Sequence, residues 1–249
     1  MTEEPYRWLE AIANRREYVR EQLKGGSPVI AASLPEGIVL VGVSSGQGKV
    51  FEIHDRQAMA ALGHPADLER IRQAAIDAAH LEAFTRAPED VSLRRLVGFG
   101  LSAQLKLNFE QLFTAPILGE FVFAELGATA STDLLVRLRF DGSFTVHSGG
   151  VVVVAPDADV EAPAAQWLST ELANAPDRNS AISRILETWW LLMASRRFNE
   201  SIPASAEREA GWRAAIEGQQ IEVGWLARNS ARPARYEPLD SKVALARKT

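Results

Sequence analysis

The spacing of apolar residues near the N-terminus predicts an amphipathic helix over residues 6–24. Apolar positions recur there at intervals of three, four and seven, at Leu9, Ile12, Val19 and Leu23. This period places them on one narrow stripe of a helix, with charged residues on the other faces. The pair Gly25-Gly26 ends the pattern, as glycine does after many helices.

A β-hairpin is the next element that the pattern predicts. Two apolar runs, Val29–Ala32 and Ile38–Val43, flank Leu34-Pro35-Glu36-Gly37, where Pro presets φ and Gly tolerates a tight reversal. A third run, Lys49–Ile53, alternates so that Lys49, Phe51 and Ile53 share one face and Val50 and Glu52 the other. A strand over Gln57–Leu62 follows and ends at Gly63.

The rest of the chain alternates between helical and extended patterns. Helices are predicted over residues 64–86, 92–113, 160–173 and 180–196, with a loop and a short helix in 199–218. An apolar ridge at every fourth residue marks the second of these helices: Leu93, Val97, Leu101, Leu105 and Phe109. Strands are predicted over residues 121–126, 134–140, 144–147, 151–155 and 221–226, with an Asp141-Gly142 hairpin turn.

Strands in two groups, separated by helices, predict a layered α+β fold. We find no internal repeat and no linker, so one domain over residues 1–249 is expected, with a mobile tail at 241–249.

Composition narrows the classes of function. The net charge of −5 argues against a nucleic-acid or membrane-surface role, because phosphate binding usually needs a basic surface. The chain has no cysteine, which excludes disulfides and thiolate chemistry and fits a reducing compartment. No apolar run approaches the roughly 18 residues of a membrane helix, and the polar N-terminus predicts no signal peptide. We therefore expect a soluble, cytoplasmic protein.

The order of these elements resembles the α-type subunits of the proteasome core particle, and the bacterial version most. The resemblance rests on the leading helix, the hairpin, the segment KVFEIHDR (Lys49–Arg56), the strand ending at Gly63 and the long helix after it. The segment Ile221–Leu239 is also similar to the last strand and tail of bacterial α subunits. The fold that this implies is the four-layer αββα sandwich of the N-terminal-nucleophile hydrolases, with an extra N-terminal helix.

The same resemblance implies a non-catalytic role without a cofactor. Such subunits form a homomeric ring, expected to be a heptamer, that gates substrate entry, assembles with β subunits and docks a ring-shaped ATPase or another activator. The leading helix would help to build the ring and seat it on the catalytic ring.

Lys49 is the residue to which the resemblance gives a specific role. Taken alone, a lysine after Gly-Gln-Gly is commonly a solvated residue at the start of a strand. In proteasome α subunits the matching lysine lines a pocket between neighbouring subunits and pairs with the terminal carboxylate of an activator tail, a charge-assisted contact. Gly63 and His64 match adjoining pocket positions. Of the longer N-terminal gate signature only Tyr6 and Arg7 remain, and they are the candidate gate residues.

An enzymatic alternative is a self-processing Ser peptidase in which cleavage after Gly26 frees Ser27, with Lys49 beside it. Three features oppose it: no acidic residue lies at Val41-Gly42-Val43, Pro28 follows Ser27, and the upstream segment is a helix rather than a propeptide. A third possibility is a stand-alone member of this fold with another partner.

Other catalytic patterns are absent from the sequence. His54, His64, His80 and His147 lack the paired spacing of metal ligands. There is no G-x-S-x-G elbow, and Gly46-Gln47-Gly48-Lys49 lacks the upstream glycine of a P-loop.

Overall fold

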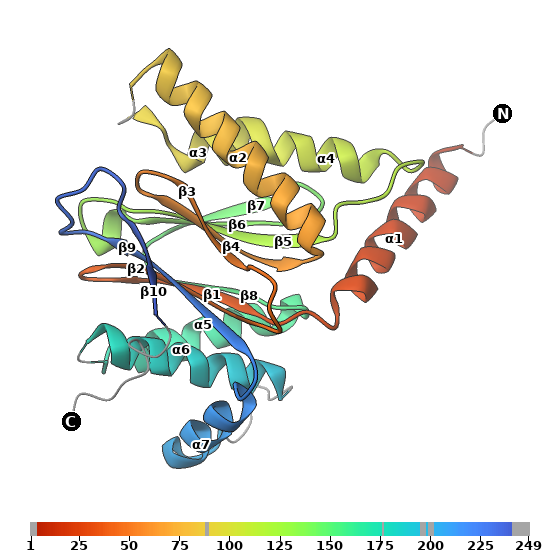
Figure 1. The fold of residues 1–249 in the computed structure, drawn as a ribbon. Coiled ribbons are helices and arrows are strands. Elements are labelled where there is room, and N and C mark those ends of the chain that lie inside the picture. The colour runs from red at the N-terminus through yellow and green to blue at the C-terminus, as the bar shows by residue number, and fades with distance from the viewer. Residues whose placement is uncertain (1–3, 88–89, 176, 195–197, 199–201, 241–249) are drawn as a thin grey trace.

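In the computed structural model, two five-stranded antiparallel sheets lie face to face between two layers of helices (Figure 1). The structure describes residues 4–87, 90–175, 177–194, 198 and 202–240. The predicted α+β four-layer sandwich with an extra N-terminal helix is confirmed. The tail predicted at 241–249 lies outside the described residues.

Each sheet is built from neighbouring antiparallel strands. The first has the order β10-β9-β2-β1-β8 and comprises β1 (Val29–Leu34), β2 (Gly37–Ser44), β8 (Val151–Val154), β9 (Gln220–Ala227) and β10 (Tyr236–Leu239). The second has the order β3-β4-β5-β6-β7 and comprises β3 (Val50–His54), β4 (Gln57–Gly63), β5 (Gly119–Glu125), β6 (Leu134–Leu138) and β7 (Phe144–Ser148).

Helices cover the outer face of each sheet (Figure 1). Over the β3–β7 sheet lie α2 (Pro65–Thr85), α3 (Leu93–Arg95) and α4 (Ser102–Glu110). Under the other sheet lie α5 (Glu161–Leu172), α6 (Arg178–Met193) and α7 (Ser205–Ala215). The first helix, α1 (Glu4–Leu23), belongs to neither layer and stands beside one end of the sandwich.

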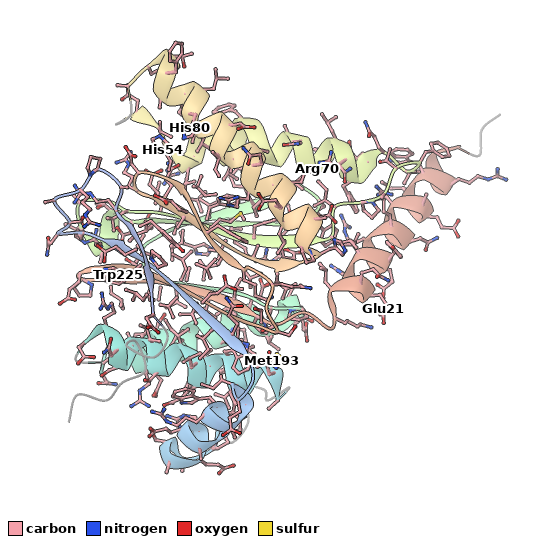
Figure 2. All side chains as sticks on the ribbon, viewed as in Figure 1. Glu21, His54, Arg70, His80, Met193 and Trp225 are labelled. Atoms are coloured by element: carbon pink, nitrogen blue, oxygen red, sulfur yellow. The ribbon has the colours of Figure 1, made fainter. Side chains whose placement is uncertain are left out.

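Strand alternation divides the core into three apolar clusters, and side chains fill the space between the layers (Figure 2). On β3, Val50 points between the sheets while Ile53 points toward α2, as the alternation predicts. The hairpin turn between β1 and β2 is also confirmed, with Leu34 opposite Gly37. A Cβ at Gly37 would lie 2.1 Å from the carbonyl oxygen of Leu226, so the neighbouring strand β9 requires glycine there.

Two predictions about elements were incomplete. The helix predicted over residues 92–113 is interrupted by a π-helical segment, Leu96–Leu101, which contains Gly98 and Gly100. Glycine is a weak α-helix former, so the segment tolerates wider winding. The strand β10 was not predicted, because it is four residues long and contains Pro238, which is confined to edge strands.

Candidate functional site

Lys49, Gly63 and His64 lie at the end of the sandwich from which α1 departs. The strands β1 and β3 begin at this end and β4 finishes there, so these three strand ends lie close to one another. Lys49 is buried and its ammonium donates a hydrogen bond of 3.0 Å to the carbonyl oxygen of Ser27. Its backbone N–H donates to the carboxylate of Glu222 at 2.9 Å. Lys49 is therefore held in place by contacts within the chain rather than solvated.

The face assigned to Lys49 was wrong. Alternation placed it with Phe51 and Ile53 on the helix-facing side of the sheet. Instead its side chain packs over Gly42 of β2, where an added Cβ would lie 3.0 Å from the Cβ of Lys49. Lys49 precedes the first residue of β3, so the alternation of that strand does not extend to it.

The surroundings of Lys49 disfavour its charge. Burial lowers the pKa of Lys49 to about 8, although the nearby Glu222 carboxylate acts in the opposite direction. Within the described part of the chain, the Ser27 carbonyl is the one hydrogen-bond acceptor of this three-donor ammonium. A carboxylate brought to this position would supply the acceptors that the ammonium lacks.

The backbone positions of Gly63 and His64 are explained by contacts within the chain itself. A Cβ at Gly63 would lie 2.2 Å from the carbonyl oxygen of Leu118, because β4 and β5 meet closely at this end. The backbone N–H of His64 donates to the same oxygen at 2.8 Å, and its exposed side chain precedes α2 without capping it. The glycine is thus required by the sheet whether or not a ligand approaches it.

The side chains of Ser27 and Lys49 do not interact with each other. The Ser27 hydroxyl accepts a hydrogen bond of 2.8 Å from the indole N–H of Trp189 on α6, and Lys49 contacts the Ser27 backbone. In this arrangement Lys49 is not positioned to activate the hydroxyl as a nucleophile.

Helix α1 is anchored from Ile12 onward, where Ile12 packs against the inter-sheet cluster. Val19 and Leu23 are buried, and Arg16 forms an ion pair of 3.2 Å with Asp141. In the first half, the side chains of residues 7–10 are exposed, including Trp8 and Leu9, the latter a member of the predicted apolar stripe. Of the two candidate gate residues, Arg7 lies in this exposed stretch. The side chain of Tyr6 is outside the described residues.

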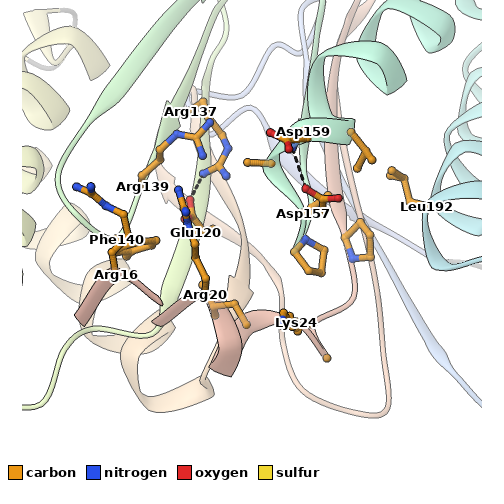
Figure 3. A pocket seen from close by; sticks show the side chains of 18 of the residues that line it. Arg16, Arg20, Lys24, Glu120, Arg137, Arg139, Phe140, Asp157, Asp159 and Leu192 are labelled. Carbon is orange, nitrogen blue, oxygen red and sulfur yellow. Dashed lines mark hydrogen bonds and ion pairs between the residues drawn. The ribbon is translucent and has the colours of Figure 1, made fainter. Parts of the chain in front are cut away.

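A cavity of about 680 Å³ lies between α1, the end of β6 and the start of α5 (Figure 3). In one wall, Arg137 is buried between Glu120 and Glu161, with 2.7 Å between its guanidinium and Glu161. Burial raises the pKa of Glu120 despite the adjacent guanidinium. Sequence reasoning missed this cluster. Its signal was an arginine inside the apolar run of β6.

A second feature missed by sequence reasoning is an apolar outer surface on the α2–α4 layer. Several large side chains on this layer point into solvent: Leu81, Phe84, Phe99, Leu107 and, in the turn after α4, Phe113. Phe84 is 89% exposed and Phe99 is 85% exposed.

Among the described residues, neither a three-ligand metal cluster nor a membrane-spanning helix is found. His54 and His80 lie near each other, with ring centroids 5.7 Å apart (Figure 2), but no group of three potential ligands occurs in this part of the chain. No helix within the described ranges is both long and apolar enough to cross a bilayer.

Comparison with known proteins gives a consistent result. No family model matches the chain. It is 32% identical over 149 residues to the proteasome subunit alpha of Paenarthrobacter aurescens, which covers 58% of this chain and 61% of that protein. The chain is a relative of actinobacterial proteasome α subunits. It is 31% identical over 166 residues to the proteasome subunit alpha of Renibacterium salmoninarum, covering 64% of this chain and 66% of that one.

A third relative, the proteasome subunit alpha of Streptomyces avermitilis, is 32% identical over 146 residues, 58% of this chain and 57% of that protein. The aligned parts thus span about three-fifths of the length of these curated relatives.

Proposed function

We propose that this chain is a non-catalytic α-type subunit of a proteasome core particle in the cytoplasm. It forms a homomeric ring, a heptamer, which caps a separately encoded ring of β subunits that carry the threonine nucleophile. Its work is to assemble the particle, to restrict substrate entry near Tyr6 and Arg7, and to dock the C-terminal tails of a ring-shaped ATPase or other activator.

The observation that carries this proposal is the sequence relationship to proteins named proteasome subunit alpha. Two structural features add support. The exposed phenylalanines of the α2–α4 layer offer an apolar surface for a second ring. The exposed start of α1 projects from the sandwich and offers a further surface for a neighbouring subunit (Figure 1).

Lys49 is the residue we assign to the activator tail. Its ammonium is partly desolvated and has one acceptor among the described residues, so a terminal carboxylate would form a strong charge-assisted hydrogen bond with it. Gly63 and His64 would lie beside that tail at the same end of the sandwich.

The test compares Lys49→Ala with Arg213→Ala, a half-exposed arginine on α7 that pairs with Glu209. Each variant is assembled with its β partner, and peptide and protein degradation are measured with and without the activator. We expect both variants to assemble, and Lys49→Ala alone to lose stimulation by the activator. Full stimulation of Lys49→Ala would refute the pocket assignment while leaving the ring proposal intact.

The alternative, a peptidase that uses Ser27, is tested by the intact mass of the purified chain. A full-length mass, less at most the initiator Met, keeps Ser27 internal and removes that mechanism. A mass short by residues 1–26 would instead show self-processing at Gly26-Ser27 and would make the chain a hydrolase.

A further inference from the structure

The two sheets of the sandwich are laterally offset by about one strand. On one side, the edge strand β8 lies against β5 and β6, so β7 extends beyond the opposite sheet. On the other side, the edge strand β3 lies against β2 and β9, so β10 extends beyond it. Each side of the molecule therefore has a step, and the two steps face in opposite directions.

The step at β7, which we call the β7 ledge, consists of Thr145 and His147. Their cross-strand partners on β6, Arg137 and Leu135, are buried between the sheets. Thr145 and His147 point to the same side but are exposed, and they bond to each other at 3.2 Å. The strand carries no proline, lysine or bulge, the devices that usually protect an edge.

The step at β10, which we call the β10 ledge, consists of Tyr236, Pro238 and the neighbouring Glu52. Tyr236 and Pro238 pair with Leu226 and Gly224 of β9 and point to the inter-sheet side. Pro238 and Glu52 are exposed. Because proline has no N–H, this edge is suited to packing through its face rather than to pairing with another strand.

The two ledges complement each other in shape and in their hydrogen-bonding groups. The β7 ledge is open toward the level of the first sheet, and the β10 ledge is open toward the level of the second. Placing one over the other would continue both sheets from one molecule to the next. The β7 ledge offers the imidazole of His147, and the β10 ledge offers the carboxylate of Glu52.

We infer that the β7 ledge of one copy of this chain packs over the β10 ledge of a second copy. This inference rests on the proposed ring and names the surfaces that close it. The contact is head-to-tail, because each copy contributes a different side, and such contacts form rings when the rotation closes.

Cross-linking tests the inference cleanly, because the chain contains no cysteine. The variant carrying His147→Cys and Pro238→Cys is treated with a short bismaleimide, and the products are separated on a denaturing gel. We expect a ladder of linked chains that ends at the ring size. Each single variant should remain unlinked, and a reassembled mixture of the two single variants should give linked dimers.

The control pair is Ala103→Cys with Glu207→Cys, two exposed sites on α4 and α7 that should give no ladder. Light scattering on every variant reports whether the oligomer forms at all. An oligomer without the ladder, or dimers of His147→Cys alone, would overturn the ledge contact and leave the ring proposal standing. A monomer for the unmodified chain, with and without its β partner, would overturn both.

Discussion

The helices that cover the β3–β7 sheet and those that cover the other sheet present different outer surfaces. The α2–α4 layer exposes Phe84 and Phe99 among other large apolar side chains. In the described residues of the α5–α7 layer, Met193 is the one exposed large hydrophobic residue, and it is only 48% exposed.

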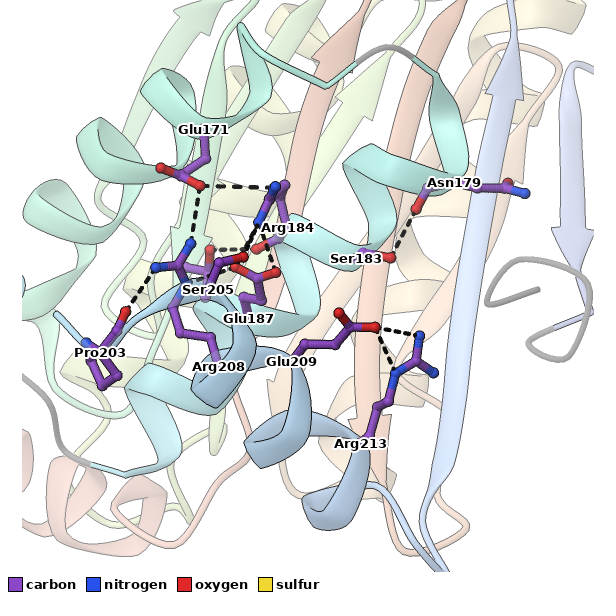
Figure 4. A network of polar contacts seen from close by, with 11 residues as sticks. Glu171, Asn179, Ser183, Arg184, Glu187, Pro203, Ser205, Arg208, Glu209 and Arg213 are labelled. Carbon is purple, nitrogen blue, oxygen red and sulfur yellow. Dashed lines mark hydrogen bonds and ion pairs between the residues drawn. The ribbon is translucent and has the colours of Figure 1, made fainter. Parts of the chain in front are cut away.

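The α5–α7 layer is instead held together by a network of ion pairs (Figure 4). Arg208 of α7 pairs with Glu187 of α6 at 2.8 Å and with Glu171 of α5 at 3.3 Å, and Arg184 joins the same carboxylates. The network ties three helices together without needing a partner. The contrast leads us to propose that one layer is completed within the chain and that a partner completes the other.

The largest expected effect comes from the apolar layer. Changing Phe84 and Phe99 to Ser should abolish formation of the complex with the β ring, because exposed aromatic anchors often supply most of an interface's energy. Stability of the free chain should change by less than about 0.5 kcal/mol, since both side chains are exposed. The matched control is Met193→Ser in the other layer, measured by light scattering of coexpressed subunits. Normal assembly of the double variant would remove this layer from the interface.

The second effect concerns the ion-pair network of the α5–α7 layer. Arg208→Met leaves Glu187 and Glu171 with Arg184 alone, and breaking such a buried pair should cost about 3 kcal/mol in unfolding free energy. Lys106→Met, which breaks an exposed pair on α4, should cost no more than about 0.5 kcal/mol. Urea unfolding compares the two. Equal losses would mean that the network contributes no more than a surface ion pair.

The third effect concerns Lys49, which lies between the two layers. Its pKa of about 8 in the folded chain is below the ordinary value of 10.5, so the unfolded chain binds more protons between these values. Stability should therefore rise as the pH increases from 8 toward 10, by on the order of 2 kcal/mol relative to Lys49→Met.

Urea midpoints at pH 7, 8, 9 and 10 for both proteins measure this difference. The series stops at pH 10 because burial also raises the pKa of Tyr236, to about 12, and its ionisation in the unfolded chain would oppose the trend above that pH. Parallel curves for the two proteins would mean that Lys49 titrates normally.

The smallest expected effect concerns Gly100, which lies in the π-helical segment of the α2–α4 layer. A Cβ at Gly100 would meet nothing within 4 Å, so Gly100→Ala should stabilise the free chain by up to about 1 kcal/mol. If a partner packs closely on the π-helical segment, the added methyl should nevertheless weaken assembly. A thermal melt and a titration with β subunits give the two readouts. Unchanged assembly would place the partner away from this segment.

Much of the fold could be predicted because its elements are long and periodic. The apolar ridge from Leu93 to Phe109 is buried at every position, and Pro35 and Gly37 located the first hairpin. The strand β10 could not be predicted, because it is held by contacts that no local pattern encodes. Tyr236 packs against the inter-sheet cluster and Leu239 against the cluster under α5–α7.

The candidate site could be predicted only in part. The resemblance singled out Lys49, but the direction of its side chain depends on Gly42 and Ser27, which belong to other segments. The ion-pair network could not be predicted either, because Arg208 and Glu171 are 37 positions apart in the sequence. Phe84 and Phe99 are aromatic residues in apolar helices, a pattern that is typical of a core and that conceals their exposure.

The π-helical segment explains how a ridge with a spacing of four can remain buried over five positions. An α-helix turns about 100° per residue, so every fourth residue advances about 40° beyond a full turn. Four such steps would carry Phe109 to the side of the helix opposite Leu93. The wider π turn cancels part of this drift, because it contains one residue more than an α turn. A single-residue deletion at Gly98 would remove that extra residue, so regular α-helical winding should keep both halves of the ridge facing the core.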